Sequence, residues 1–132
     1  MSVKKLRILI ADSHRLHSQR LDLMLSHMGY CAIVVVSTFD EVRSLTQSPL
    51  QPFDVLMINK NVSASTDVDL IQFCKENINV RYALIYLNDS FSLLGGCWPN
   101  RQNILISIPY LSDVEVIRLM MGIIEWSGAI HA

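Results

Sequence analysis

The sequence predicts an α/β protein with a doubly wound parallel sheet, and two observations carry this prediction. Five short apolar runs of strand length alternate strictly with segments of helical spacing, which is typical of a parallel sheet covered by helices on both faces. Hydrophobic residues make up 51% of the chain and charged residues only 17%, a balance that indicates a buried sheet and a protein interface. Right-handed crossovers between the strands complete the doubly wound arrangement.

The first strand and helix are predicted over residues 6–28. Residues 6–12 form an apolar, β-branched run that ends in Asp12, and the helix follows with Ser13 as its N-cap and Gly29 as its C-terminal stop. The apolar positions of this helix recur at helical spacing. They are Leu16, Leu21, Met24, Leu25 and Met28.

The next elements follow directly. Residues 31–37 are predicted as the second strand and 39–48 as a short helix, with Asp40 and Glu41 in its first turn, where the helix dipole favours acids. Pro49 and Pro52 bracket the turn into the third strand, 54–59, which stops at Asn59. A polar loop is predicted over 60–66.

The second half of the chain repeats the alternation. A helix is predicted over 67–76, a strand over 82–87, a strand over 104–108 ended by Pro109, and a last helix over 112–126. Residues 88–103 are at most weakly helical, because Gly95, Gly96 and Pro99 interrupt them.

Composition narrows the class of protein. The chain of 132 residues suits one domain, 1–132, with a core of about residues 5–127. A net charge of −1, without a basic stripe or a helix-turn-helix, argues against direct binding of nucleic acid. Three widely spaced cysteines favour a reducing compartment, and neither a signal peptide nor an apolar run of membrane-spanning length is found, so we expect a cytoplasmic protein that is not inserted in a membrane.

The opening stretch "ILIADSHRLHSQRLDLMLSHMGY", residues 8–30, resembles the start of a bacterial response-regulator receiver domain. The resemblance extends over about residues 5–127 through element order and spacing. It implies the flavodoxin-like (CheY-like) (βα)5 fold, with five parallel strands in the order 2-1-3-4-5. In that family a partner histidine kinase transfers a phosphoryl group to an aspartate at the end of the third strand.

The chemical groups of that family fall on positions that this chain has changed. Receivers hold Mg²⁺ with two adjacent acids after the first strand and surround the phosphoryl group with a Thr or Ser after strand four and a Lys after strand five. The matching positions here are Asp12, Ser13, Asn59 in place of the acceptor, Leu87 (followed by Asn88) and Ile108. Of these five groups, only the Asp12 carboxylate survives.

These changes predict a pseudo-receiver that is not an enzyme. Hard cations need several anionic oxygens, and the loss of two carboxylates leaves Mg²⁺ binding weak or absent, with no other cofactor implied. An amide at Asn59 is a poor phosphoryl acceptor, and an apolar Ile108 replaces the cation that would face phosphate. The resemblance therefore implies a protein–protein interaction module of two-component signal transduction or a phosphorelay. It also allows the chain to be the N-terminal part of a longer regulator.

The last predicted helix suggests a partner surface, because its apolar residues exceed one stripe. The residues expected at this interface are Val114, Ile117, Met121, Ile124 and Trp126. A homodimer is the favoured assembly, and a signalling protein or an output domain is the other expected partner. The alternative is that these residues only cover the core.

The sequence is compatible with two other functions. A displaced acid, Asp12 or Asp89, could accept the phosphoryl group, or the vacated pocket, lined by Leu87 and Ile108, could bind a small ligand. Asp12 itself is more easily explained as a solvated or capping carboxylate than as a remnant metal ligand. His14 and His17 share a helix face, for which solvation is a simpler explanation than metal binding. The sequence leaves the isomer of the Ile108–Pro109 bond open.

Overall fold

The computed structural model describes residues 4–48, 51–63, 69–86 and 104–106, together with 117–118, 121–122 and 124–125. Four parallel strands form the body of the sheet in the order β2-β1-β3-β4: β1 (Lys4–Ala11), β2 (Tyr30–Val36), β3 (Phe53–Asn59) and β4 (Val80–Tyr86). A three-residue segment, β5 (Ile104–Ile106), pairs in parallel with β4. The prediction of an α/β protein with an all-parallel sheet ordered 2-1-3-4 is confirmed.

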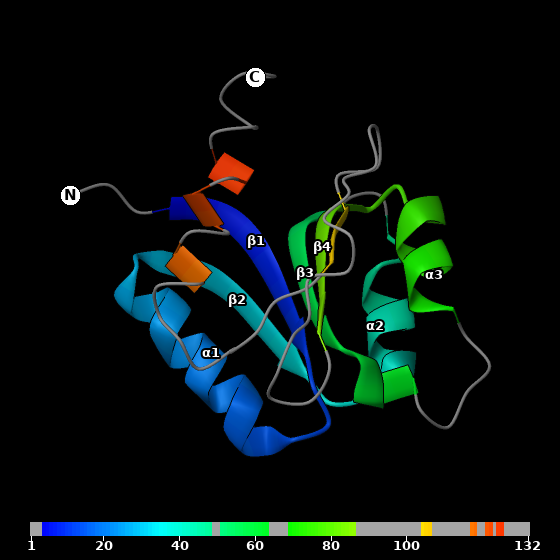
Figure 1. Ribbon diagram of the computed structural model, residues 1–132. Helices are drawn as coiled ribbons and strands as arrows, with labels where there is room; N and C mark the ends of the chain where they lie inside the picture. The colour runs from blue at the N-terminus through cyan, green and yellow to red at the C-terminus, as the bar shows by residue number, and fades with distance from the viewer. Residues whose placement is uncertain are drawn as a thin grey trace.

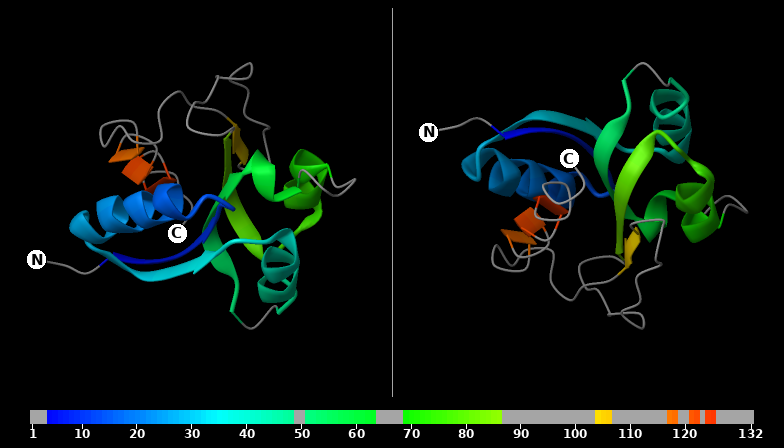
Figure 2. Two further views of the ribbon diagram at one scale, coloured as in Figure 1. Left: turned by 90° about the horizontal axis from the view of Figure 1, so that it is seen from below. Right: turned by 90° about the horizontal axis from the view of Figure 1, so that it is seen from above.

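Helices cover both faces of this sheet (Figures 1 and 2). One face carries α1 (Arg15–His27) and the helical residues between 117 and 125. The other face carries α2 (Phe39–Leu45) and α3 (Leu70–Glu76), and a 3₁₀ turn, η1 (Lys60–Ser63), follows β3 directly. The described elements therefore form three layers, as expected for parallel strands buried on both sides.

The alternation of side chains along the strands divides the core into two clusters. Ile8 and Ile10 of β1 face the α1 layer, whereas Leu9 and Ala11 face the α2 and α3 layer, and all four are fully buried. Because both faces are covered, the strands read as continuous apolar runs and not as an apolar–polar alternation.

The start of α1 differs from the prediction. His14, and not Ser13, is the N-cap residue, and its own side chain makes no capping bond. The Asp12 carboxylate accepts the His14 backbone N–H instead, at 2.8 Å, because the acid at the strand end reaches across the turn. The predicted stop is confirmed, since Gly29 has a φ of 102°, a conformation that favours glycine.

The other boundaries shift by a few residues. A capping box joins Thr38 and Glu41 at the start of α2, and bonds from the backbone of Ser37 and the hydroxyl of Thr38 lower the pKa of Glu41. The helix ends three residues before its predicted end, where the Thr46 hydroxyl donates back to the Val42 carbonyl. The helix α3 begins at Leu70 with Asp69 as its N-cap, and not at residue 67.

Three of the residues predicted at an interface on the last helix lie in the core of the described chain. Ile117, Met121 and Ile124 are each only 1% exposed and pack in the same cluster as α1. They are buried because α1 alone does not cover this face of the sheet. The Tyr30 hydroxyl at the start of β2 donates to the Glu125 carboxylate, which fixes this segment further. The other two predicted interface residues, Val114 and Trp126, lie outside the described residues.

Within the part of the chain that the structure describes, no helix has the length and apolar character needed to cross a bilayer.

The two described cysteines differ in environment, and this difference is testable. Cys31 on β2 is exposed, whereas Cys74 on α3 is buried, and burial raises the pKa of its thiol to about 12. Because the thiolate is the reactive species, N-ethylmaleimide at neutral pH should modify Cys31 within minutes and leave Cys74 unmodified. Peptide mapping by mass spectrometry measures this, with protein unfolded in guanidinium as the control in which both react. Rapid labelling of Cys74 in the folded protein would contradict the packing of α3.

Candidate functional site

The candidate site lies at the carboxyl edge of the three central strands, where ligands bind in open α/β sheets. Asp12 follows β1, Asn59 ends β3 and Tyr86 ends β4. Asn59 and Tyr86 are register partners across β3 and β4. The parallel topology therefore brings together three polar side chains that are far apart in the sequence.

The Asp12 carboxylate is the centre of this arrangement. Its side chain is almost fully buried. Asn59 Nδ2 and the Tyr86 hydroxyl donate to its Oδ2 at 3.2 and 2.8 Å, and the His14 N–H and Asn61 Nδ2 donate to its Oδ1 at 2.8 and 3.3 Å. We call Asp12, Asn59, Asn61 and Tyr86 the Asp12 cluster.

Backbone contacts fix the two amides of the Asp12 cluster. Asn59 is 0% exposed, and its Oδ1 accepts the N–H of Asn61 at 3.0 Å, so its NH₂ group points to Asp12. The Oδ1 of Asn61 accepts the N–H of Ser13 at 3.3 Å, and the NH₂ group again points to Asp12. Both amides therefore present donors, and not acceptor oxygens, to the buried carboxylate.

The Tyr86 hydroxyl is held in its protonated form. Burial, together with the adjacent negative charge of Asp12, raises the pKa of the Tyr86 phenol well above its usual range. The hydroxyl thus remains a hydrogen-bond donor to Asp12 throughout the physiological pH range.

The Asp12 cluster does not fit the Mg²⁺ site of a receiver domain. An ionised carboxylate has about four acceptor positions, and four protein donors already occupy those of Asp12. Mg²⁺ requires anionic or carbonyl oxygens, and the neighbouring groups offer N–H and O–H donors. No group of three or more His, Cys, Asp or Glu residues within the described ranges could hold a metal ion.

Two histidines border the Asp12 cluster. The rings of His14 and His17 stack at 4.2 Å, and His17 Nδ1 lies 3.6 Å from Asp12 Oδ2, which is beyond hydrogen-bond length. This nitrogen is buried and has no hydrogen-bond partner among the described residues. His17 is thus only partly solvated, in contrast to the expected solvated face, whereas His14 is exposed.

The structure places only some of the predicted site residues. Asp12, Ser13 and Asn59 come together as expected, and Asp12 is the buried capping carboxylate that was one of its two predicted roles. The predicted residues Leu87, Asn88, Asp89 and Ile108, and the Ile108–Pro109 bond, lie outside the described residues.

Sequence reasoning missed Asn61 and Tyr86. The signal for Asn61 was available, since an Asn two residues after Asn59 can fold its amide back on the strand end. Tyr86 lies one residue before the position that spacing assigned to the hydroxyl-bearing residue, and only the register of β4 with β3 shows that its hydroxyl reaches Asp12.

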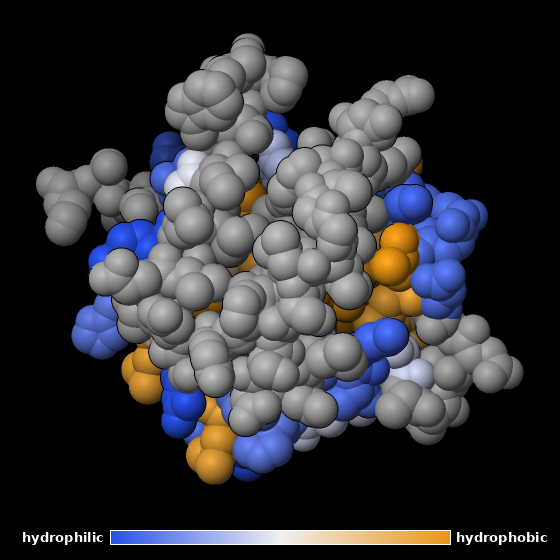
Figure 3. All heavy atoms as spheres, viewed as in Figure 1, coloured by the Kyte–Doolittle hydropathy of each residue, from blue (hydrophilic) through white to orange (hydrophobic). Residues whose placement is uncertain are grey.

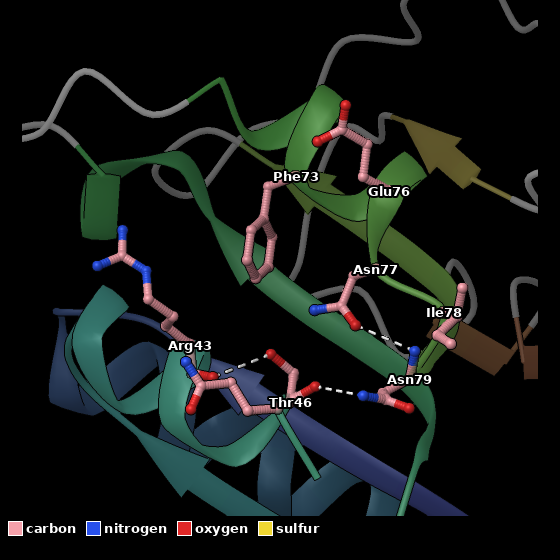
Figure 4. A pocket seen from close by; sticks show the side chains of 8 residues that line it. Arg43, Thr46, Phe73, Glu76, Asn77, Ile78 and Asn79 are labelled. Carbon is pink, nitrogen blue, oxygen red and sulfur yellow. Dashed lines mark hydrogen bonds between the residues drawn. The ribbon is translucent and has the colours of Figure 1, made fainter. Parts of the chain in front are cut away.

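A hollow of about 310 Å³ lies between the C-terminal ends of α2 and α3. Figure 4 shows Arg43 and Phe73 on opposite sides of it, and the Asn79 amide donates to the Thr46 carbonyl at 2.7 Å along its floor. Its position, beside the amino ends of β3 and β4, is opposite to the edge at which parallel sheets bind ligands. This hollow is therefore separate from the Asp12 cluster.

Comparisons with protein-family models, with curated proteins and with solved structures each found no match to this chain.

Proposed function

We propose that this chain is a pseudo-receiver of a two-component-type signalling protein, a module that binds other proteins and accepts no phosphoryl group. The proposal includes the doubly wound (βα)5, flavodoxin-like fold of receivers. The sheet order β2-β1-β3-β4 and the helices on both faces are compatible with this fold. Asp12 and Asn59 lie at the ends of the two strands that carry the acids in that family. A cytoplasmic location belongs to the same proposal.

The saturation of the Asp12 carboxylate is the observation that carries this proposal. Phosphoryl transfer to a carboxylate requires a nucleophilic oxygen that the donor can reach and a cation to neutralise the developing charge. Asp12 is 1% exposed and accepts bonds from Asn59, Asn61 and Tyr86, so its oxygens are neither accessible nor available to a metal ion. The same burial argues against Asp12 as a displaced phosphoryl acceptor.

A binding role is supported by apolar surface that the fold leaves exposed. Leu16 and Leu23, seven residues apart on α1, are 66% and 62% exposed, on the side of the helix away from the core. Apolar surface is visible among polar residues over α1 (Figure 3). A partner that covered these side chains would remove apolar surface from water, which favours binding.

Intact-mass spectrometry after incubation with acetyl phosphate and Mg²⁺ tests this proposal. The native chain should show no phosphoryl adduct, because the one carboxylate of the Asp12 cluster is buried and occupied. A small-molecule donor bypasses the partner kinase, so a negative result reports on the site itself. An adduct would contradict the proposal, and peptide mapping would then decide between Asp12 and Asp89, whose phosphorylation is the competing hypothesis.

The same experiment includes two variants. Asp12→Asn should behave like the native chain, and Asn59→Asp tests whether restoring the acceptor carboxylate alone restores the reaction. We expect Asn59→Asp to be phosphorylated at least about a hundredfold more slowly than a site that keeps the other receiver groups, since those groups remain changed and each missing charge contact costs about tenfold or more in rate.

A further inference from the structure

Among the described strands, β2 forms one outer edge of the sheet. It is the last strand on its side in the described order β2-β1-β3-β4-β5, and Figure 2 shows it outermost. Its sequence, YCAIVVV, contains no charge and no proline. The pairing of Ala32–Val36 with β1 is regular, and the one register shift lies opposite Tyr30–Ala32. Native proteins protect edge strands with charges, prolines or bulges, and this strand has none of these devices over its regular part.

The backbone of β2 presents hydrogen-bonding groups to the outside at alternate residues. The Asp12 N–H donates to the Val36 carbonyl at 3.2 Å, so the backbone groups of Val36 face β1. Because the direction of these groups alternates along a strand, those of Cys31, Ile33 and Val35 face outward. No hydrogen bond joins these outward groups to another described residue.

The side chains of the same three residues are apolar and partly accessible. Val35 is 41% exposed, Cys31 is exposed, and Ile33 is partly buried against the α1 layer. A strand edge that has no pairing partner among the described strands, with β-branched residues and no charge, is a template for pairing with another strand.

We propose that the outer edge of β2 pairs antiparallel with β2 of a second copy of this chain, centred on Ile33. This pairing supplies a protein partner for the proposed binding module, and it therefore rests on the proposed function. In this register outward-facing residues meet outward-facing residues, so each pair exchanges both of its N–H···O bonds about a twofold axis. Cys31 then lies opposite Val35 of the partner subunit. Because β2 carries no charged residue, pairing it with a second copy of itself brings no like charges together.

The expected dimer is weak. One strand pair buries less than the roughly 1,200–2,000 Å² of a stable interface. Sedimentation velocity of the native chain should therefore show a monomer–dimer equilibrium between about 5 and 500 µM. Val35→Lys should raise the dissociation constant at least about tenfold, since a lysine on an edge strand blocks pairing. Leu45→Lys, at a similarly exposed residue of α2 (38% against 41%), should leave the dissociation constant unchanged.

A disulfide trap tests the register. In Val35→Cys, a cysteine at 35 faces the native Cys31 of the partner subunit at a Cα separation of about 5.5 Å, within disulfide range. Mild oxidation should yield a covalent dimer, and Cys31→Ser/Val35→Cys should not, because two residues at 35 would lie about 13 Å apart in this register. Circular dichroism checks that all variants are folded.

Two results would overturn the pairing. One is a native chain that stays monomeric up to about 500 µM, which would leave the edge to a different strand. The other is a dimer that Val35→Lys and Leu45→Lys affect equally. Either result leaves the phosphodonor experiment untouched, and a phosphoryl adduct on a chain that still dimerises through β2 would contradict the proposed function alone.

Discussion

Replacing Ile117 with alanine should lower the free energy of unfolding by about 2–5 kcal/mol. Ile117 is 1% exposed and packs against the strands on the α1 side, so the substitution removes buried methyl groups and leaves a cavity. Urea denaturation followed by circular dichroism measures the loss. A decrease in the midpoint without a change in the slope would show that stability, and not the compactness of the unfolded state, has changed.

The matched control for this prediction is Leu23→Ala on α1. Leu23 is 62% exposed, and truncating it should change the free energy of unfolding by less than about 0.5 kcal/mol. The opposite pattern, with Ile117→Ala stable but altered in its oligomeric state, would contradict the core position of Ile117 and restore the predicted interface on the last helix.

The second large effect is expected from Asn59→Asp. This substitution removes the donor that lies 3.2 Å from Asp12 Oδ2 and places a second carboxylate against the first, in a site where both residues are buried. Two like charges at about 4 Å repel by roughly 4 kcal/mol in a partly screened site. We expect the variant to lose about 3 kcal/mol of stability at neutral pH, because a buried charge without compensation is costly.

This loss should depend on pH in a defined direction. Two carboxylates that share one site raise the pKa of one of them in the folded state, so the folded protein binds more protons than the unfolded chain. The stability of Asn59→Asp relative to the native chain should therefore be lowest above the raised pKa and recover as the pH falls through it toward the unfolded pKa of about 3.9. Urea denaturation at neutral pH and at about pH 5 measures the change.

A charge-swapped variant controls for the change in shape. Asp12→Asn/Asn59→Asp again has a single carboxylate in the Asp12 cluster, and it should recover more than half of the stability that Asn59→Asp loses at neutral pH. A native-like stability of Asn59→Asp itself would show that the cluster tolerates a second charge, and it would contradict the electrostatic part of the account.

The strands could be predicted from the sequence because their signal is local. Runs such as 6–12 and 54–59 are mostly apolar, a pattern typical of strands that are covered on both faces. The helix starts were less predictable, because capping depends on which side chain reaches the free N–H groups. Asp12 caps α1 from outside the helix, and Ser13 does not.

The last helix shows where composition misleads. Its excess of apolar residues was interpreted as an interface, but Ile117, Met121 and Ile124 serve the core. A sequence does not show how much of a sheet face the preceding helices leave uncovered. Among the described residues, exposed apolar side chains lie on α1 and along β2, and residues such as Leu16 and Val35 carry no special signal in the sequence.

The candidate site was predictable only in part, because some of its contacts depend on strand register and loop geometry that the sequence does not show. Asp12 and Asn59 are strand-end residues, and their proximity follows from parallel topology alone. The donors that saturate Asp12 depend on register and on the turn after β3, which place Tyr86 and Asn61 within bonding distance. Their effect is decisive, because they close the hydrogen-bonded cluster around the Asp12 carboxylate.

A Mg²⁺ titration followed by ¹H–¹⁵N NMR tests whether the Asp12 cluster is closed to divalent cations. We expect the amide signals of Ser13, His14, Asn59 and Asn61 to show no saturable shift up to about 10 mM Mg²⁺, because protein donors already occupy the Asp12 oxygens. Saturable shifts centred on these four amides would show that the cluster opens to bind the ion and is not closed.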